Sequence, residues 1–275
     1  MPPRSRQANW QARIDRALRL SSQYEFAHEI LQFYAWVASF QKSLHTNIAS
    51  STDQVSLGGF EAGARGAIDL SVVLPHYREF LALIEQKAPS ALGDAAGEVA
   101  SLSLHLWVEG LEEYWRHGGI DDPPGGSFAQ FLPRAFLQPY AEFRAGRTER
   151  AALETTVNLC PLCRARPLLG VLRPEGDGGK RFLLCSFCSH EWEFRRIYCA
   201  HCGETQEESL PVFVAQKFPH IRVEACDTCR HCIRTVDLTK DGNAVPVVDD
   251  LAAIPLGLWA EEYGYQRIHG NLLGT

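Results

Sequence analysis

Four Cys-x-x-Cys pairs decide how the second half of this chain folds: CPLC at 160–163, CSFC at 185–188, CAHC at 199–202 and CDTC at 226–229. Two cysteines separated by two residues can direct both sulfurs at one metal ion when the backbone forms a tight knuckle, and two knuckles complete a tetrahedron. The linkers within the first two and the last two pairs hold 21 and 23 residues, close to the spacing of four-cysteine ribbons. The sequence therefore predicts two closed metal sites, with the ligands Cys160, Cys163, Cys185 and Cys188, and Cys199, Cys202, Cys226 and Cys229.

The cysteine pairs also form an internal repeat. The first pair recurs after 39 residues and the second after 41, which indicates duplication of one small unit. We favour sequential pairing, because each repeat then forms a complete ribbon. An interleaved arrangement, first pair with third and second with fourth, satisfies the same valences and stays open as an alternative.

The nine cysteines, all after residue 159, admit either disulfides or metal ligation. The first twenty residues contain no continuous apolar stretch of the length that a secretory signal needs. We therefore expect a reducing, cytoplasmic location, where this spacing favours metal binding over disulfides. Zinc and iron both accept four thiolates, so the ligands alone do not choose between them. A closed site without an open coordination position favours a structural or electron-carrying role over a hydrolytic one.

Cys232 is left over from the two predicted sites. It can substitute for a ligand, react as a free thiol or be inert, and we favour the inert role because reactivity requires an exposed thiolate. His190, His201 and His231 lie beside the cysteine pairs, but each site is already complete, so we expect them at the surface or around the ligands.

Other catalytic patterns are weak or missing in the sequence. Glu25-x-x-His28 has the spacing found in di-iron helix bundles, but those bundles need a second such motif, and the chain has none. His-Glu-x-x-His, Gly-x-Ser-x-Gly and phosphate-binding glycine loops are also missing. We therefore predict that the protein is not an enzyme in its own right.

The charge and hydropathy of the chain restrict the classes of partner that it is expected to bind. The net charge is −6, with 11 basic and 9 acidic residues between 160 and 235, so that region carries +2 and the remainder −8. Such a balance disfavours binding to nucleic acid or anionic lipid, which favours a clustered positive surface. The most apolar window, 33–40, is far shorter than the roughly 20 residues that cross a bilayer, so we expect no membrane insertion.

The first 158 residues are predicted to be mainly α-helical. Residues 23–46 carry apolar side chains at intervals of three and four, which predicts a helix with one face in the core: Phe26, Ile30, Phe33, Val37, Phe40 and Leu44. A second helix carries Tyr77, Leu81 and Ile84 between Pro75 and Pro89.

The next helical pattern carries Val99, Leu102 and Leu106 and ends near Gly118. Residues 121–126, DDPPGG, predict a turn. Residues 127–158 then predict a further helical segment that is interrupted around Pro133 and Pro139, since proline removes a helical hydrogen bond.

Short strands are predicted around the cysteine pairs. Apolar runs at 181–184 and 220–223 precede the second pair of each repeat, and a strand at 233–238, a turn at 240–243 and a helix at 249–263 follow. The predicted class is α+β: an α-helical domain at 1–158, four-cysteine ribbons of the zinc-ribbon type at 159–197 and 198–236, and a C-terminal segment at 237–275 that packs back on the helical domain.

These motifs resemble the FdhE family of formate dehydrogenase accessory (formation) proteins. The resemblance covers nearly the whole chain and is most specific in its cysteine half, at LCPLC 159–163, RFLLCSFC 181–188, EW 191–192, RIYCAHCG 196–203, VEACDTC 223–229, DDLA 249–252 and LWA 258–260. The sequence departs from the family pattern at Arg164, where a glycine commonly follows the first knuckle, and at Cys232, where an aromatic residue is usual.

The resemblance implies a cytoplasmic bacterial protein that is required for active respiratory formate dehydrogenase and binds the catalytic subunit of that enzyme before export. It further implies two mononuclear, rubredoxin-like four-cysteine centres, with iron favoured and zinc as the alternative. A rubredoxin-like electron carrier and a nucleic-acid-binding zinc ribbon are the competing functional hypotheses. The oligomeric state, a homodimer included, stays open.

Overall fold

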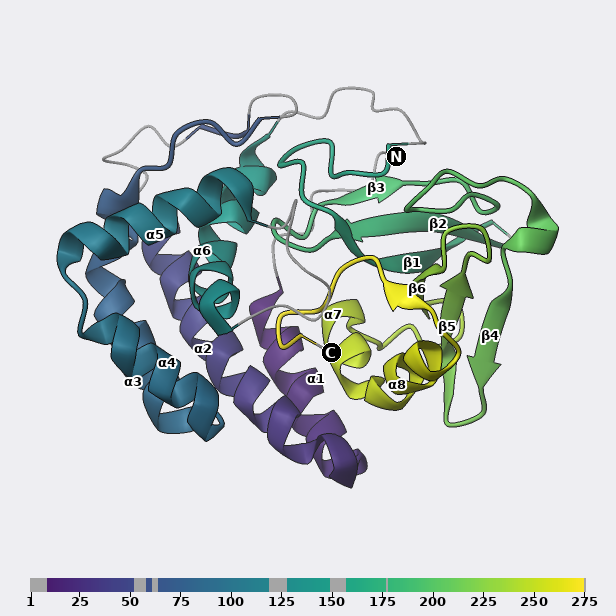
Figure 1. The fold of residues 1–275 in the computed structure, drawn as a ribbon, viewed down its shortest axis with the longest axis horizontal. Helices are drawn as coiled ribbons and strands as arrows, with labels where there is room; N and C mark the ends of the chain where they lie inside the picture. The colour runs from purple at the N-terminus through teal and green to yellow at the C-terminus, as the bar shows by residue number, and fades with distance from the viewer. Residues whose placement is uncertain are drawn as a thin grey trace.

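The computed structural model describes residues 9–51, 58–60, 64–118, 128–148, 157–176 and 178–274. Helices form one half of the molecule and a mixed sheet the other (Figure 1). The predicted α+β class is therefore confirmed. Within the described residues, no helix combines the length and the apolar character that a bilayer crossing needs.

Six α-helices are described in the first half: α1 Trp10–Gln23, α2 His28–Ser51, α3 Tyr77–Lys87, α4 Ser90–Ala100, α5 Leu104–His117 and α6 Phe128–Arg147. The first of them was not predicted. It begins where the side chain of Asn9 accepts a hydrogen bond from the amide of Ala12, and it ends at Tyr24, whose backbone is extended. The predicted helix at 23–46 therefore begins later, at His28, and continues to Ser51.

The apolar stripe of α2 is buried only in part. Phe33, Val37 and Leu44 lie in the core as predicted, whereas Ile30 and Phe40 are half-buried. The core prediction is wrong for Phe26, which is 45% exposed. Phe26 lies in the short 3-10 helix Glu25–Ala27 before α2. The three- and four-residue spacing of an α-helical face, on which the prediction depended, therefore does not apply to it.

Helix α3 confirms its prediction, with Tyr77, Leu81 and Ile84 all buried. The single helix predicted through Val99, Leu102 and Leu106 is wrong, because α4 ends at Ala100 and α5 begins at Leu104. Leu102 and Leu106 are exposed. The buried side of α5 consists instead of Trp107, Leu111, Tyr114 and Trp115.

Helix α6 continues through both prolines, so the predicted interruption is wrong. Pro139 has no amide hydrogen to donate to the carbonyl of Ala135 one turn earlier. The buried side chain of Gln41, from α2, supplies the missing donor, because its Nε2 lies 2.7 Å from that carbonyl. The turn predicted at 121–126 and the helix predicted beyond 148 fall outside the described residues.

The second half contains one sheet: β1 Pro167–Glu175, β2 Gly178–Cys185, β3 Glu191–Glu193, β4 Val212–Ala215, β5 Phe218–Ala225, β6 His231–Asp237 and β7 Gln266–Arg267. The strand order is β3-β2-β1-β6-β5-β4, with β7 paired to β6. Each repeat therefore contributes a three-stranded antiparallel meander. The predicted strands correspond to β2, β5 and β6, whereas β1, β3, β4 and β7 were not predicted.

The two meanders join where β1 and β6 pair in parallel. Gly170 stands opposite Thr235 at this junction, and a Cβ atom on residue 170 would lie 2.2 Å from Thr235 Oγ1. A residue without a side chain is needed for the two backbones to approach this closely. The two ribbons thus share one sheet. We propose the division into ribbons at 159–197 and 198–236 and a C-terminal segment at 237–275.

Two helices follow the sheet, where the sequence predicted one: α7 Pro246–Ala252 and α8 Ile254–Glu262. Pro255 occupies the first turn of α8, a position that proline tolerates well. Helix α7 contacts α1 and α2 on one side and β1 and β6 on the other, so it lies between the two halves of the molecule (Figure 1).

A buried ionic cluster around Asp250 holds this C-terminal region in place. Asp250 Oδ1 lies 2.7 Å from Nε of Arg234 and 3.1 Å from Nη2 of Arg267, and Asn271 Nδ2 donates to Oδ2 at 3.1 Å. Burial alone would raise the pKa of Asp250, but the two arginines outweigh it and hold the pKa below its usual range. Burial and the nearby Arg267 lower the pKa of Arg234 to about 10, so both groups are charged at neutral pH.

We expect Asp250→Ala to destabilise the protein by about 3–5 kcal/mol, because it leaves two buried guanidinium groups without their carboxylate. Asp94→Ala, at an exposed position on α4, is the matched control and should change stability by less than about 0.5 kcal/mol. Denaturant unfolding of both variants checks this, and equal stabilities for the two would contradict the role given to Asp250.

Candidate metal centre

The first candidate site gathers Cys160 and Cys163, which precede β1, with Cys185 and Cys188 at the end of β2. The Sγ atoms of Cys160 and Cys188 lie 3.6 Å apart, and those of Cys163 and Cys185 lie 3.4 Å apart. Four sulfurs at 2.3 Å from one ion, in a tetrahedron, are separated by about 3.8 Å. The observed spacing therefore fits a four-thiolate site with modest expansion.

The second candidate site gathers Cys199 and Cys202, before β4, with Cys226 and Cys229, between β5 and β6. The Sγ atoms are 3.8 Å apart between Cys199 and Cys229 and 3.7 Å apart between Cys202 and Cys226. The eight predicted ligands are thus brought together in sequential groups, and the interleaved alternative does not match the structure.

All four knuckles share one backbone conformation. The residue after each second cysteine has a positive φ, in the left-handed region: Arg164 at 64°, Ser189 at 53°, Gly203 at 82° and Arg230 at 57°. In each Cys-x-x-Cys pair, the amide of the first cysteine donates to the carbonyl of the residue five positions later, for example from Cys160 to Ala165 at 2.8 Å. Arg164 therefore adopts the conformation that glycine favours, at a cost of roughly 1–2 kcal/mol.

Backbone amides also point at the sulfurs. The amides of Phe187 and Cys188 donate to Cys185 Sγ at 3.4 Å, and the amides of His201 and Cys202 approach Cys199 Sγ at 3.4 and 3.5 Å. Hydrogen bonds to the charged form stabilise a thiolate. The knuckles thus supply both the directions and the electrostatics that an anionic ligand set requires.

The first site lies within the hydrophobic core. All four of its cysteines are buried, and burial raises the pKa of Cys160 and Cys188 well above the usual value. The thiols of Cys160 and Cys188 therefore favour the protonated form unless a cation replaces the protons, whereas hydrogen bonds with the neighbouring cysteines outweigh burial and lower the pKa of Cys163. The environment therefore favours a bound metal ion over free thiolates.

Three arginines of the helical half hold the knuckles of the first site. Arg65 Nε donates to the carbonyl of Cys163 at 2.8 Å, and Arg134 Nη2 donates to the carbonyl of Ser186 at 3.2 Å. Arg13 binds both carboxylate oxygens of Glu142, which also accepts a hydrogen bond from Ser189 Oγ at 2.6 Å.

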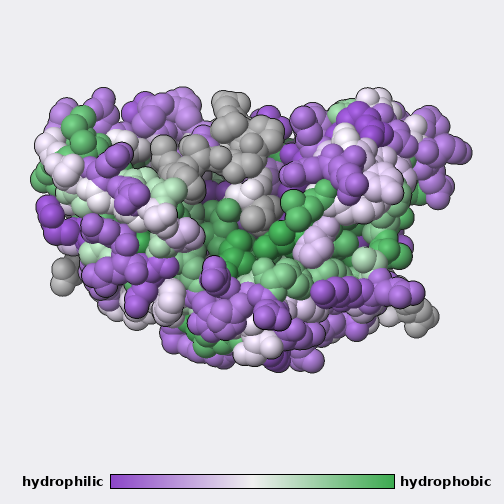
Figure 2. All heavy atoms as spheres, turned by 60° about the horizontal axis from the view of Figure 1, so that its bottom comes forward, coloured by the Kyte–Doolittle hydropathy of each residue, from purple (hydrophilic) through white to green (hydrophobic). Residues whose placement is uncertain are grey.

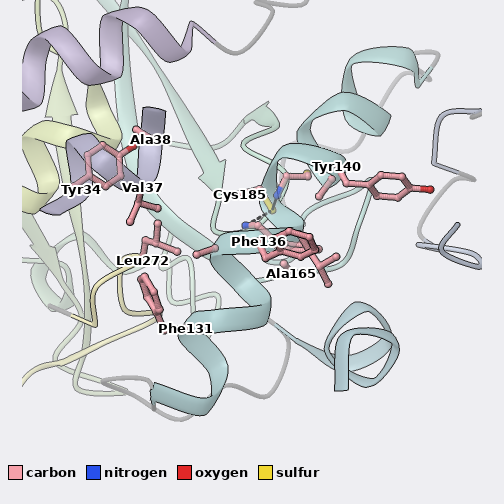
Figure 3. Close-up of a cluster of buried hydrophobic side chains, with 14 of the residues drawn as sticks. Tyr34, Val37, Ala38, Phe131, Phe136, Tyr140, Ala165, Cys185 and Leu272 are labelled. Atoms are coloured by element: carbon pink, nitrogen blue, oxygen red, sulfur yellow. Dashed lines mark hydrogen bonds between the residues drawn. The ribbon is translucent and has the colours of Figure 1, made fainter. Parts of the chain in front are cut away.

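Apolar contacts fix the first site to the same helices. Figure 3 shows Cys185 and Ala165 beside Phe136 of α6, and all three belong to one buried cluster that continues through α2. The first site is therefore a joint between the helices and the sheet.

The second site faces solvent instead. Cys202 is exposed and Cys229 is half-exposed. The contacts around it are mostly local: Thr228 Oγ1 donates to Glu204 at 2.7 Å, and Arg230 and Tyr265 both donate to Asp227. This asymmetry could not be predicted from the sequence, because the knuckles themselves are alike.

His201 and His231 lie beside the second site with stacked rings, 3.7 Å between centroids and 11° between planes. A nitrogen of each ring lies within 4.8 Å of Cys229 Sγ. Lone pairs of two parallel rings do not converge on one ion, so we interpret the pair as a cover over the site. His190 stacks on Trp192 instead.

Cys232 lies on β6, outside both cysteine groups, and is 2% exposed. Burial raises the pKa of this thiol. A buried, protonated thiol is a poor nucleophile, which agrees with the inert role expected from the sequence.

The sequence did not predict the cluster of His220, Asp241 and Asp249, whose ligand-type atoms also lie within 4.8 Å of one another. Arg16 pairs with both carboxylates, and His220 Nε2 lies 2.9 Å from Asp249 Oδ1. The negative charge is thus already compensated, so this cluster is an ion-pair network that holds α1 against α7 and β5. The described residues place neither Glu25 nor His28 in a metal-binding group.

We expect the double variant Cys160→Ser, Cys163→Ser to lose about one metal ion per chain and to be destabilised by about 4 kcal/mol or more, because the first site lies in the core. The double variant Cys199→Ser, Cys202→Ser should lose one ion with a smaller loss of stability. Elemental analysis and thermal unfolding measure both effects, with Cys232→Ala as the control that retains both ions. Unchanged metal content in either double variant would refute that site.

The unequal burial of the two cysteine sites predicts that they lose their metal ions at different rates. A chelator should remove the ion of the second site at least about tenfold faster than that of the first, because Cys202 and Cys229 are open to solvent. Metal release followed over time should show two phases, and the fast phase should be missing from the Cys199→Ser, Cys202→Ser variant. A single phase with both ions lost together would contradict this assignment.

Comparison with known proteins agrees with the geometry. The central-domain model of FdhE matches residues 159–196, and its C-terminal-domain model matches residues 197–273. An FdhE homolog of Aquifex aeolicus (strain VF5) is 25% identical over 270 residues, which cover 95% of this chain and 94% of that protein. An FdhE homolog of Pseudomonas aeruginosa is 32% identical over 193 residues, 66% of this chain and 62% of that protein.

The fold has a solved counterpart. The crystal structure of the FdhE protein from Pseudomonas aeruginosa superposes with a TM-score of 0.70 at 24% identity, and covers 99% of this chain and 97% of that one. At this identity the likeness establishes the fold alone. Two adjoining domain models and relatives that align along most of the chain agree with the cysteine geometry, so the resemblance to the FdhE family is confirmed.

Proposed function

We propose that this chain is an accessory protein required for the maturation of respiratory formate dehydrogenase, and that it binds the catalytic subunit of that enzyme in the cytoplasm before export. The observation that carries the proposal is the pair of closed four-cysteine sites within the two segments that match the FdhE domain models. Similarity to the FdhE family supports a role linked to formate dehydrogenase.

The two sites would each hold one mononuclear metal ion, with iron favoured and zinc the alternative. Cys160, Cys163, Cys185 and Cys188 would hold the first ion, and Cys199, Cys202, Cys226 and Cys229 the second. An ion bound by four thiolates supplies cross-linking of the knuckles and, if it is iron, one-electron chemistry. The knuckle amides directed at the sulfurs support a bound cation of either kind, and iron is favoured only through the resemblance to the FdhE family.

Binding, with no turnover of a substrate, is the proposed mode of action. Four thiolates fill a tetrahedral ion completely, so neither site offers an open position to a substrate. The first site would fix the helical half against the sheet, and the second would present a rigid, partly exposed surface to a partner. The accessory role therefore requires no catalytic residue.

An electron-carrying role is the second candidate, and the exposure of Cys202 and Cys229 favours it. An electron can reach a partly exposed iron site more easily than a buried one. This role requires a reversible change in visible absorbance when the iron-loaded protein is reduced. A nucleic-acid-binding role has less support, since the net charge of −6 opposes it.

We expect that deletion of the gene abolishes formate-dependent respiration and leaves growth by other routes intact. Complementation with the wild-type chain should restore formate oxidation, and complementation with the Cys160→Ser, Cys163→Ser variant should not, because the first site stabilises the fold. The Cys232→Ala variant is the control and should restore activity. The formate oxidation rate of isolated membranes is the measurement, and it is compared among the deletion strain and the three complemented strains.

Direct binding gives the second arm of this test. The purified, metal-loaded chain should retain the purified catalytic subunit on an affinity resin. Normal formate oxidation in the deletion strain, or no retention of the subunit, would each argue against the proposed function.

A further inference from the structure

A large groove lies where the helical half meets the C-terminal residues, and none of its described lining residues is a cysteine of either metal site. Its volume is about 1150 Å³, and it is bounded by the start of α2, the connection between α3 and α4, the start of α6 and the C-terminal residues 269–274. Figure 2 shows hydrophobic side chains gathered in a hollow across the middle of one face of the molecule, with hydrophilic residues around it. The apolar part of the groove includes Ile30, Phe33, Leu92, Phe131 and Leu272.

Two aromatic side chains of the groove are unusually exposed for their size. Trp36 is 40% exposed and Phe26 is 45% exposed. Each carries a lysine over its ring, with Lys87 Nζ 4.9 Å from the centroid of Trp36 and Lys217 Nζ 4.5 Å from that of Phe26. Exposed aromatic rings that a partner can cover are typical anchors of protein interfaces.

The charge of the groove favours an acidic partner. Glu29 is the carboxylate among the described lining residues, against the cations Lys87 and Arg134. Neither Lys87 nor Lys217 forms an ion pair among the described residues, so both ammonium groups are open to a carboxylate from outside. Cations beside apolar pockets select segments in which acidic and apolar side chains alternate.

One wall of the groove offers a hydrogen-bond acceptor. Gln130 Oε1 is buried and has no partner among the described residues. A buried acceptor without a donor is energetically unfavourable, and a ligand with an N–H group would remove that penalty. A peptide backbone supplies such a donor along its whole length.

The groove is preformed. Arg134 donates to the carbonyls of Gly270 and Asn271, and so fixes the C-terminal residues as a wall. A volume above the usual range of small-molecule sites, about 300–1000 Å³, suits several residues of an extended chain better than a compact cofactor.

We propose that this groove binds an extended segment of the client catalytic subunit, one in which apolar side chains are flanked by acidic residues. Its apolar side chains cover Trp36 and Phe26, its carboxylates pair with Lys87 and Lys217, and a backbone N–H donates to Gln130. This inference rests on the proposed function, because it assigns the client to a surface of the chain.

The test uses overlapping peptides of about 15 residues that cover the catalytic subunit, with binding to the metal-loaded protein measured by fluorescence anisotropy. We expect acidic, apolar peptides to bind, and added salt to weaken them. Trp36→Ala should weaken the best peptide roughly 30-fold. Lys87→Glu, at an exposed position, should weaken it about tenfold.

Two controls separate the groove from general effects. Lys42→Glu makes the same charge change on α2 outside the groove, and Leu104→Ala removes an exposed apolar side chain on α5, so both should bind like the wild type. Thermal unfolding verifies that each variant is folded. Equal binding by Lys87→Glu and Lys42→Glu, or a preference for basic peptides, would overturn the proposal.

Retention of the intact catalytic subunit tests the groove assignment and the accessory function separately. If the wild type retains the subunit and both groove variants retain it equally well, the groove assignment falls and the accessory function stands. If the wild type retains no subunit, the accessory function falls. A wild-type dimer that Trp36→Ala dissociates would assign the groove to a second copy of the chain and overturn the client assignment.

Discussion

The convergence of Cys160, Cys163, Cys185 and Cys188 inside the hydrophobic core is the constraint on which the rest of the structure depends. Four buried thiolates are tolerable only when a cation and hydrogen bonds compensate their charge. The knuckles supply the hydrogen bonds, and Arg13, Arg65 and Arg134 tie them to the helices. This site therefore joins the sheet to the helices, in addition to the contacts that α7 makes with both halves.

Duplication gave two ligand sets with the same backbone and different surroundings. The first lies under α6 and its neighbours, whereas the second lies at the far side of the shared sheet with two of its sulfurs open to solvent. Identical ligands in a dry and in a wet environment differ in metal exchange and in access for electrons or partners. The first site suits a structural role, and the second suits contact with other molecules.

Arg134 connects the first site to the groove. The same guanidinium group donates to Ser186 in the second knuckle of that site and to Gly270 and Asn271 in the groove wall. Asn271 in turn donates to Asp250, whose ion pairs hold α7 against the sheet. The shape of the groove thus depends on the same buried polar contacts that position the knuckles.

The sequence alone determined what depends on near neighbours. The ligand spacing, the repeat and helix α3 were readable because a knuckle or a helical face involves only residues a few positions apart. The tertiary structure decided the rest. Gln41, distant in sequence, satisfies the carbonyl that Pro139 leaves without a donor in helix α6, and Gly170 allows the close approach to Thr235 where the two ribbons join. The unequal burial of the two sites likewise depends on which side chains, distant in sequence, pack around each set of sulfurs.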